Sequence, residues 1–288
     1  MDIFNIIIII GLFHFSLSDG NIWRDYPTCR IGRLQSPIRI KEYESIYANN
    51  FSFVYQNYKE CNCNNSNNTN NTNNYAYTIE CNEGTGGYVN LERGGVIKQY
   101  EFIRAEIYPA LHEVDGQKKD GDYELHLIHK KNLDFITNKN QYRSIQDPNM
   151  YLIVVLRYRN CSEKDACSSD NGLLEQLTSE NENITSFNLN KYNIFQDKRA
   201  YFYEGSFVHI PCDENVNYYI VKDFFNFKIN NTNISDFSNG NKIDKINLAN
   251  VFGRPIYKNF MNYREVLGNY YFSFKNNIVS FLFIIIFL

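Results

Sequence analysis

The sequence has little net charge, a single Trp and no apolar run long enough to cross a bilayer as a helix. Its net charge of −3 gives no support for nucleic-acid binding, which needs a basic surface. The apolar runs at 3–17 and 278–288 are both shorter than the roughly 20 residues that a spanning helix needs. A lone C-x-C at Cys61 and Cys63 lacks the second pair of a zinc knuckle. No repeat or composition break divides residues 23–265, which predicts one domain.

Apolar and aromatic residues are abundant instead. Hydrophobic residues make up 43% of the 288-residue chain, enough for a sizeable core, and Tyr and Phe number 23 and 22. Asn is also frequent, and Asn, Tyr, Ile, Lys and Phe all have AT-rich codons. Part of this bias therefore reflects the genome and says little about function.

Both ends of the chain resemble processing signals. Residues 1–18 are typical of a secretory signal peptide, with small residues after the apolar run. Residues 267–288 form a polar spacer and an apolar tail, the pattern of a GPI-attachment signal. We therefore expect the secretory pathway and an outer-leaflet lipid anchor. The candidate attachment residues are Gly268, Asn269 and Ser273.

Seven Cys follow the predicted signal, so disulfides are expected and one thiol stays unmatched. Cys81 is expected to pair with Cys61 or Cys63, and Cys161 with Cys167. An Asn-rich insertion, about residues 62–74, lies between Cys61 and Cys81 in the sequence. Its composition predicts a mobile surface loop. Glycosylation sequons begin at Asn50, Asn67, Asn70 and Asn183.

Short alternating segments separated by Gly and Asn turns predict a mostly β protein. One helix is predicted at 172–181, where three Leu recur at helical spacing. The predicted strands are 51–55, 75–80, 88–92, 98–108, 123–129, 151–159 and 217–225.

The segment YELHLIHKK, residues 123–131, has the pattern of a metal-binding strand. Glu124 and His126 share one face of such a strand, while Leu125 and Leu127 take the other. An imidazole with a carboxylate beside it is a common metal-ligand arrangement. The segment alone leaves the other ligands open.

Five segments together resemble the alpha-carbonic anhydrase family, in family order over about 240 residues. They are WRDYPTCRIGRLQSPIRI (23–40), GGVIKQYEFIRAEIYPALHEVDG (94–116), YELHLIH (123–129), YFYEGSFVHIPC (201–212) and NVFGRPIY (250–257). The resemblance implies a large twisted, mostly antiparallel sheet of about ten strands, with short surface helices, spanning residues 19–266. It also implies a disulfide between Cys29 and Cys212.

In that family three His hold a zinc ion, two from F-H-x-H and one from E-L-H, and the zinc-bound water becomes the hydroxide that attacks carbon dioxide. The resemblance makes His126 the third ligand and Glu124 its orienting carboxylate. Aligned on the upstream Tyr, the first two ligand positions fall on Glu106 and Tyr108. Aligned on the downstream A-L-H, they fall on Ala105 and Ile107 instead. Neither alignment supplies a His.

The residues that assist the zinc hydroxide in the family also differ. Val208 stands where a Thr accepts the hydroxide's hydrogen bond, and Leu111 where a carboxylate orients that Thr. Tyr75 takes the place of the proton-shuttle His. The resemblance makes His112 and His129 structural. A single His does not hold zinc against water, so we expect neither zinc nor carbonic anhydrase activity.

These losses favour a catalytically inactive ectodomain that works in binding, adhesion or scaffolding, with an unidentified protein or glycan ligand. The Asn-rich, GPI-tailed composition also resembles apicomplexan surface or rhoptry antigens, such as those of malaria parasites. An alternative is a metal-dependent enzyme with an altered site of His126, His209 and Glu106. A second alternative is a lectin-like glycan-binding module that uses the Lys clusters at 116–121 and 129–132.

Overall fold

The computed structural model describes the part of the chain between the two predicted signals. The described residues are 29, 32–48, 51–64, 77–93, 96–118, 122–133, 149–160, 172–178, 186–192, 194, 199–209, 212–227, 248–249 and 253–261. Several predictions therefore lie outside them: both terminal signals with Gly268, Asn269 and Ser273; Tyr75 and residues 65–74; Cys161 and Cys167; and the sequons at Asn50, Asn67, Asn70 and Asn183.

Twelve strands form one large sheet, with a separate small sheet of β1 and β8. The main order is β11-β4-β5-β7-β9-β10-β13-β12-β14-β2, and β3 joins through β6, which pairs with β7. The strands are β1 Arg39–Ile40, β2 Ile46–Tyr47, β3 Phe51–Tyr58, β4 Cys61–Asn64, β5 Tyr77–Cys81, β6 Gly87–Arg93, β7 Val96–Pro109, β8 Glu113–Val114, β9 Tyr123–Lys131, β10 Tyr151–Asn160, β11 Ser186–Phe187, β12 Ala200–Gly205, β13 Val216–Phe227 and β14 Tyr257–Lys258.

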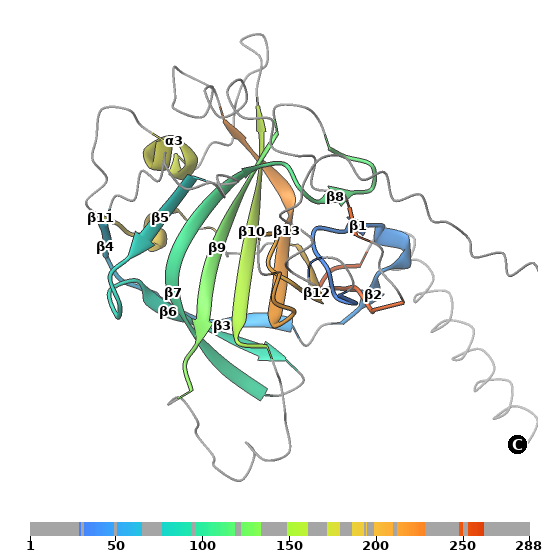
Figure 1. Cartoon of the computed structure of the whole chain (residues 1–288), viewed down its shortest axis with the longest axis horizontal. Coiled ribbons are helices and arrows are strands. Elements are labelled where there is room, and N and C mark those ends of the chain that lie inside the picture. The colour runs from blue at the N-terminus through green and yellow to red at the C-terminus, as the bar shows by residue number, and fades with distance from the viewer. Residues whose placement is uncertain are drawn as a thin grey trace, which may run out of the picture.

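The long strands β7, β9, β10 and β13 form the curved centre of the sheet (Figure 1). Neighbours in the main sheet are antiparallel except for two parallel pairs, β10 with β13 and β14 with β2. β10 reads YLIVVLRYRN, a nearly continuous apolar run, because both of its faces are covered.

The core has two sides, one on each face of the sheet. In β10, Leu152 and Val154 belong to the larger apolar cluster, while Ile153 and Val155 belong to the second. The larger cluster includes the Leu residues of helix α3, Leu173–Thr178, so this helix covers that face. The second side carries the polar residues described below.

The predicted fold class is confirmed, and most predicted strands match strands of the sheet. Within the predicted helix 172–181, the described helical residues are 173–178. Residues 200–205, which are not among the predicted strands, form β12, because this segment pairs with both β13 and β14. Two short 3-10 turns complete the described elements, η2 Glu42–Glu44 and η3 Leu189–Tyr192. Among the described residues, no helix is long and apolar enough to cross a membrane.

A disulfide between Cys61 and Cys81 joins β4 to β5, with Cα atoms 5.3 Å apart. Of the two pairings that the sequence left open, the structure has the one with Cys61. β4 also includes residues 62–64, so the first part of the predicted insertion belongs to the sheet. The disulfide ties together the two strands from which residues 65–76 depart.

Candidate functional site

The site lies where β7 and β9 run side by side on the second face of the sheet. Their register places Glu106 opposite His126 and Tyr108 opposite Glu124. Because side chains alternate along a strand, all four lie on one face. Ala105 and Ile107 point into the larger cluster on the other face. Of the two residue pairs that the alignments offered, Glu106 and Tyr108 are therefore the pair on the same face as His126.

The carboxylate of Glu124 holds a fully buried hydrogen-bond network. Its Oε1 accepts the backbone N–H groups of Leu111 and His112, at 3.0 and 2.7 Å. Its Oε2 lies 2.8 Å from Nδ1 of His112 and 3.0 Å from Nε2 of His126. Burial alone would raise the pKa of Glu124, but these hydrogen bonds and the imidazoles together move it well below the ordinary carboxyl value. Glu124 is therefore an ionised acceptor.

This network fixes the orientation of both imidazoles. An ionised carboxylate can only accept, so Nδ1 of His112 and Nε2 of His126 each carry a proton. Nε2 of His112 lies 2.8 Å from the hydroxyl of Tyr203, which in turn lies 3.1 Å from Oγ of Ser36. Burial lowers the pKa of His112, so it stays neutral. His112 is part of the framework.

His126 keeps one unused nitrogen. With Nε2 bonded to Glu124, its Nδ1 carries a lone pair, and this buried atom has no hydrogen-bond partner in the part of the chain that the structure describes. The imidazole packs against the ring of Tyr108, with centroids 4.8 Å apart. Glu124 thus orients the imidazole of His126 as a carboxylate orients a metal-binding His, but here the imidazole packs against the ring of Tyr108.

Glu106 is fully engaged by its neighbours. Its Oε1 accepts from Nε of Arg104 at 2.7 Å, and its Oε2 accepts from the hydroxyl of Tyr108 at 2.7 Å. Burial would raise the pKa of Glu106, but the charges of Arg104 and His209 and these hydrogen bonds lower it below its ordinary value. Glu106 is therefore a negative charge already neutralised by Arg104.

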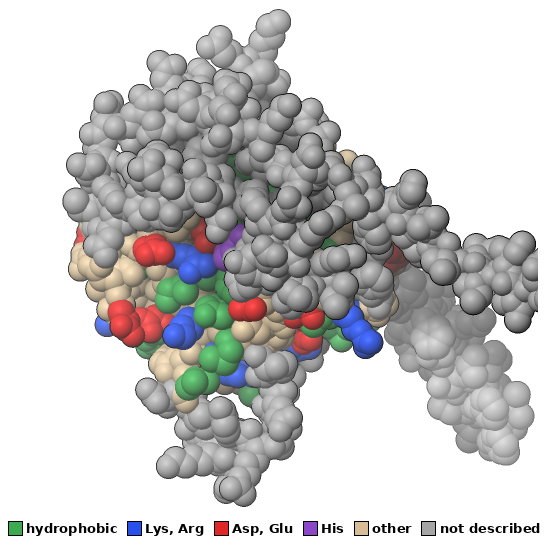
Figure 2. All heavy atoms as spheres, in the orientation of Figure 1, with side chains coloured by type: hydrophobic (Ala, Val, Ile, Leu, Met, Phe, Trp, Pro, Cys, Tyr) green, Lys and Arg blue, Asp and Glu red, His purple; other side chains and the backbone are tan. Residues whose placement is uncertain are grey.

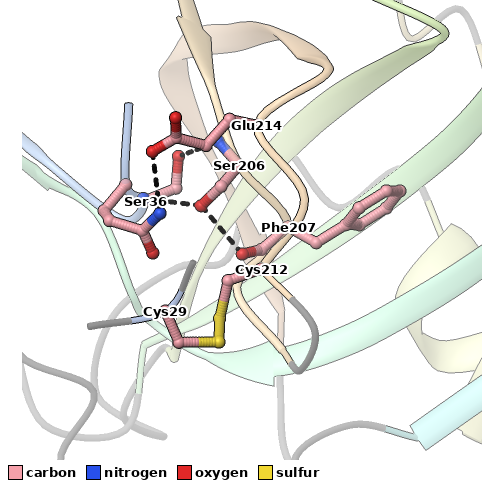
Figure 3. The surroundings of a disulfide bond; sticks show 7 residues. Cys29, Ser36, Ser206, Phe207, Cys212 and Glu214 are labelled. Atoms are coloured by element: carbon pink, nitrogen blue, oxygen red, sulfur yellow. Dashed lines mark hydrogen bonds between the residues drawn. A yellow bond between two sulfur atoms is a disulfide. The ribbon is translucent and has the colours of Figure 1, made fainter. Parts of the chain in front are cut away.

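The loop after β12 brings Val208 and His209 over this site. A disulfide between Cys29 and Cys212, the pairing that the resemblance implies, joins this loop to the N-terminal segment (Figure 3). Beside it, the backbone N–H of Ser36 donates to Oγ of Ser206 at 3.1 Å. These bonds set the position of the loop above β7 and β9.

Three of the altered positions pack together. Tyr108, Leu111 and Val208 form a small apolar cluster of their own, and these residues are 1%, 4% and 3% exposed. Leu111 and Val208 are the two positions where the resemblance implies a carboxylate and a hydroxyl. The apolar side chains at these two positions are compatible with each other, because Leu111, Val208 and Tyr108 shield one another from solvent.

His209 is the only described His that reaches the surface. Its Nε2 lies 3.7 Å from Oε1 of Glu106, and its ring stacks on Phe207 with centroids 5.1 Å apart. Its side chain is 26% exposed, whereas the other three described His are buried. In Figure 2 a small His surface, in purple, lies near acidic and basic side chains.

A family model of eukaryotic-type carbonic anhydrases matches residues 18–267. The chain belongs to this family. No curated protein sequence matches it.

Two solved structures show the same carbonic anhydrase fold. Dioscorin, in complex with ascorbate, has a TM-score of 0.53 and 19% identity, over 83% of this chain and 90% of its own. The alpha-carbonic anhydrase from Thermovibrio ammonificans, in complex with sulfanilamide, has a TM-score of 0.54 and 19% identity, over 83% of this chain and 96% of its own. At this level of identity the similarity establishes the fold.

The zinc ion implied by the family does not fit the residues present. Nδ1 of His126 is the one suitable nitrogen on these strands. Burial and the nearby charge of Glu106 raise the pKa of Tyr108 well above its usual value, so its hydroxyl stays protonated and is a poor ligand. The guanidinium of Arg104 also lies where it repels a dication near Glu106.

The alternative metal set is not assembled either. Among the described residues, only His112, Glu124 and His126 bring three ligand atoms within 4.8 Å of one another. That group is the hydrogen-bond network above, in which one carboxylate oxygen already binds both imidazoles. Glu106 and His209 are close together, but they do not form such a group with His126.

Two residues of the site were missed by sequence reasoning. Arg104, two residues before Glu106 on the same strand face, could have been found from the opposite charges at that spacing. Phe207 carries no sequence signal of its role, because it contacts His209 through the fold of the loop.

Proposed function

We propose that this member of the carbonic anhydrase family does not hydrate carbon dioxide and works as a binding domain. The observation that carries the proposal is the apolar packing of Tyr108, Leu111 and Val208. A zinc hydroxide needs three protein ligands and an oriented hydrogen-bond acceptor. Here one ligand position is part of an apolar cluster, and both positions that assist the hydroxide are apolar as well.

The test is carbon dioxide hydration by stopped-flow spectroscopy, with metal analysis of the same protein after incubation with zinc. We expect hydration at the buffer rate and far less than one zinc per chain. A hydration rate that is inhibited by a sulfonamide contradicts the proposal. The matched variant His126→Ala should behave as the wild type in both measurements.

We further propose that the domain is displayed at a membrane surface by a GPI anchor, on the cell surface or in a secretory organelle such as the rhoptry of an apicomplexan. The disulfide Cys29–Cys212 supports an oxidising, secretory environment. The ligand is a protein or a glycan. The fold can carry a ligand, since dioscorin was solved with ascorbate.

The anchor is tested with phosphatidylinositol-specific phospholipase on membranes that contain the full chain, and by mass spectrometry of the mature C-terminal peptide. We expect release into the supernatant and a peptide that ends among residues 268–273. A C-terminal peptide that ends at Leu288 contradicts the GPI anchor.

A further inference from the structure

The last strand of the sheet exposes an unusual group of apolar side chains. β2 lies at the end of the strand order, and the adjoining turn η2 precedes it. Tyr43, Ile46 and Tyr47 are 74%, 51% and 40% exposed. Single exposed apolar residues are ordinary, but three within five consecutive residues on a sheet edge mark an interaction surface. We name these three residues the edge patch.

The charges beside the edge patch neutralise one another. Nζ of Lys41 lies 3.0 Å from Glu44, and Nε of Arg39 lies 2.7 Å from Glu113. The surface is therefore apolar and aromatic without a net charge of its own. Such a surface suits an uncharged or zwitterionic partner better than an acidic or basic one.

The chain leaves the described fold next to the same edge. β14 runs parallel to β2, with Lys258 opposite Tyr47, and Met261 is the last residue that the structure describes. The predicted attachment residues 268–273 follow after 7 to 12 further residues. Even a fully extended chain of that length reaches only about 25–42 Å. An anchor there keeps this edge, rather than the opposite end of the sheet, near the lipid.

We propose that the edge patch rests on the lipid surface and sets the orientation of the domain on the membrane. This inference depends on the membrane anchoring proposed above. Tyr side chains suit the interface because the ring enters the apolar boundary while the hydroxyl stays hydrated. A contact with β2 turns the rest of the sheet away from the membrane. The Glu106 site, six strands away at β7, is then presented to the surroundings.

The test uses the full anchored chain, purified in detergent and reconstituted into phosphatidylcholine vesicles with and without brominated acyl chains. Bromine quenches nearby Trp, and Trp23 gives the same background in every variant. Because interfacial apolar groups lie at the acyl boundary, Tyr43→Trp emission should fall roughly twofold in brominated vesicles. The matched control is Ile97→Trp, which replaces another exposed apolar residue on β7 and should not be quenched.

A second variant separates contact from simple proximity. Adding Ile46→Ser and Tyr47→Ser to Tyr43→Trp should reduce quenching to the control level while the chain still sediments with vesicles. Adding Ile97→Ser and Leu133→Ser instead should leave the quenching unchanged. A blue-shifted Tyr43→Trp emission of the phospholipase-released domain in detergent-free buffer indicates a second copy or another protein on the edge patch, and overturns the proposal.

The two proposals fail in different ways. A chain that stays in the supernatant overturns the membrane anchoring and this inference together. A chain that sediments with vesicles, but whose Tyr43→Trp is quenched no more than Ile97→Trp, overturns only the inference.

Discussion

The hydroxyl of Tyr108 donates a hydrogen bond of 2.7 Å to the carboxylate of Glu106. The resemblance to the carbonic anhydrase family implies zinc ligands at these two positions. Here the two side chains form a hydrogen bond with each other instead. Arg104 completes the arrangement by neutralising Glu106. The site is thus a closed ion-pair cluster built on a scaffold that still orients His126.

Restoring both missing ligands should restore zinc binding. The variant Glu106→His/Tyr108→His should take up about one zinc per chain, because Glu124 still orients His126. Its hydration rate should remain at least about 100-fold below that of active relatives, since Val208 and Leu111 cannot orient a hydroxide. Adding His126→Ala should abolish the binding. Zinc uptake that survives this third change means that the metal sits elsewhere.

The apolar cluster should show coupling between Leu111 and Val208. Leu111→Glu should cost about 3 kcal/mol of unfolding free energy, because it buries a charge, and Val208→Thr about 1–2 kcal/mol. In the double variant the new hydroxyl and carboxylate can bind each other, so the cost should be about 1 kcal/mol less than the sum. Urea denaturation measures all three. Leu111→Met is the control, at under about 1.5 kcal/mol, and strict additivity contradicts the predicted contact.

The free energy of unfolding should decrease when the pH is lowered, because of His129. Burial lowers its pKa to about 4, and its ring lies 2.8 Å from the hydroxyl of Tyr58 and 2.9 Å from the carbonyl of Leu127. Between about pH 6.5 and pH 4 the unfolded chain binds a proton that the folded chain does not, so this contribution is complete above pH 6.5 and is lost on acidification.

The measurement compares urea unfolding at pH 7 and pH 5. Wild type should lose about 2 kcal/mol more than His129→Gln over this interval. The difference isolates His129, because other titrating groups act in both proteins. An equal pH dependence in the two proteins means that His129 titrates normally in the fold.

The two disulfides should contribute unequally. They close segments with sequence separations of 183 and 20 residues. In the chain-entropy model, Cys29→Ala/Cys212→Ala should cost about 5 kcal/mol and Cys61→Ala/Cys81→Ala about 3 kcal/mol. Denaturant unfolding of the two double variants gives the order. The first should also loosen the loop that carries Val208 and His209, which hydrogen exchange detects, and the second should leave that loop unchanged.

Much of the fold follows from the sequence, because its apolar alternation and five motifs identify the long strands. The two-residue strands β1, β2, β8, β11 and β14 carry no periodicity, so only the sheet defines them. The alignment of the ligand positions was ambiguous by one residue, and one residue exchanges the two faces of a strand. β7 contains such an irregularity against β9, between Phe102 and Arg104. Only the register shows which residues meet His126.

The sequence predicts which ligand and polar groups are missing from the site, but not how the remaining side chains pack there. The sequence shows that Leu111 and Val208 lack polar groups. It does not show that they pack on Tyr108, since the three residues come from separate segments. The pairing of Glu106 with both Arg104 and Tyr108 depends likewise on side-chain geometry.

The disulfide between Cys61 and Cys81 has a consequence for how this sequence can vary. It joins β4 to β5 directly, so the pairing of these two strands does not depend on the number of residues between them. For a flexible loop in general, doubling the length raises the entropic cost of closure by only about 0.6 kcal/mol. Insertions and deletions within the Asn-rich segment should therefore leave the pairing of β4 with β5 undisturbed.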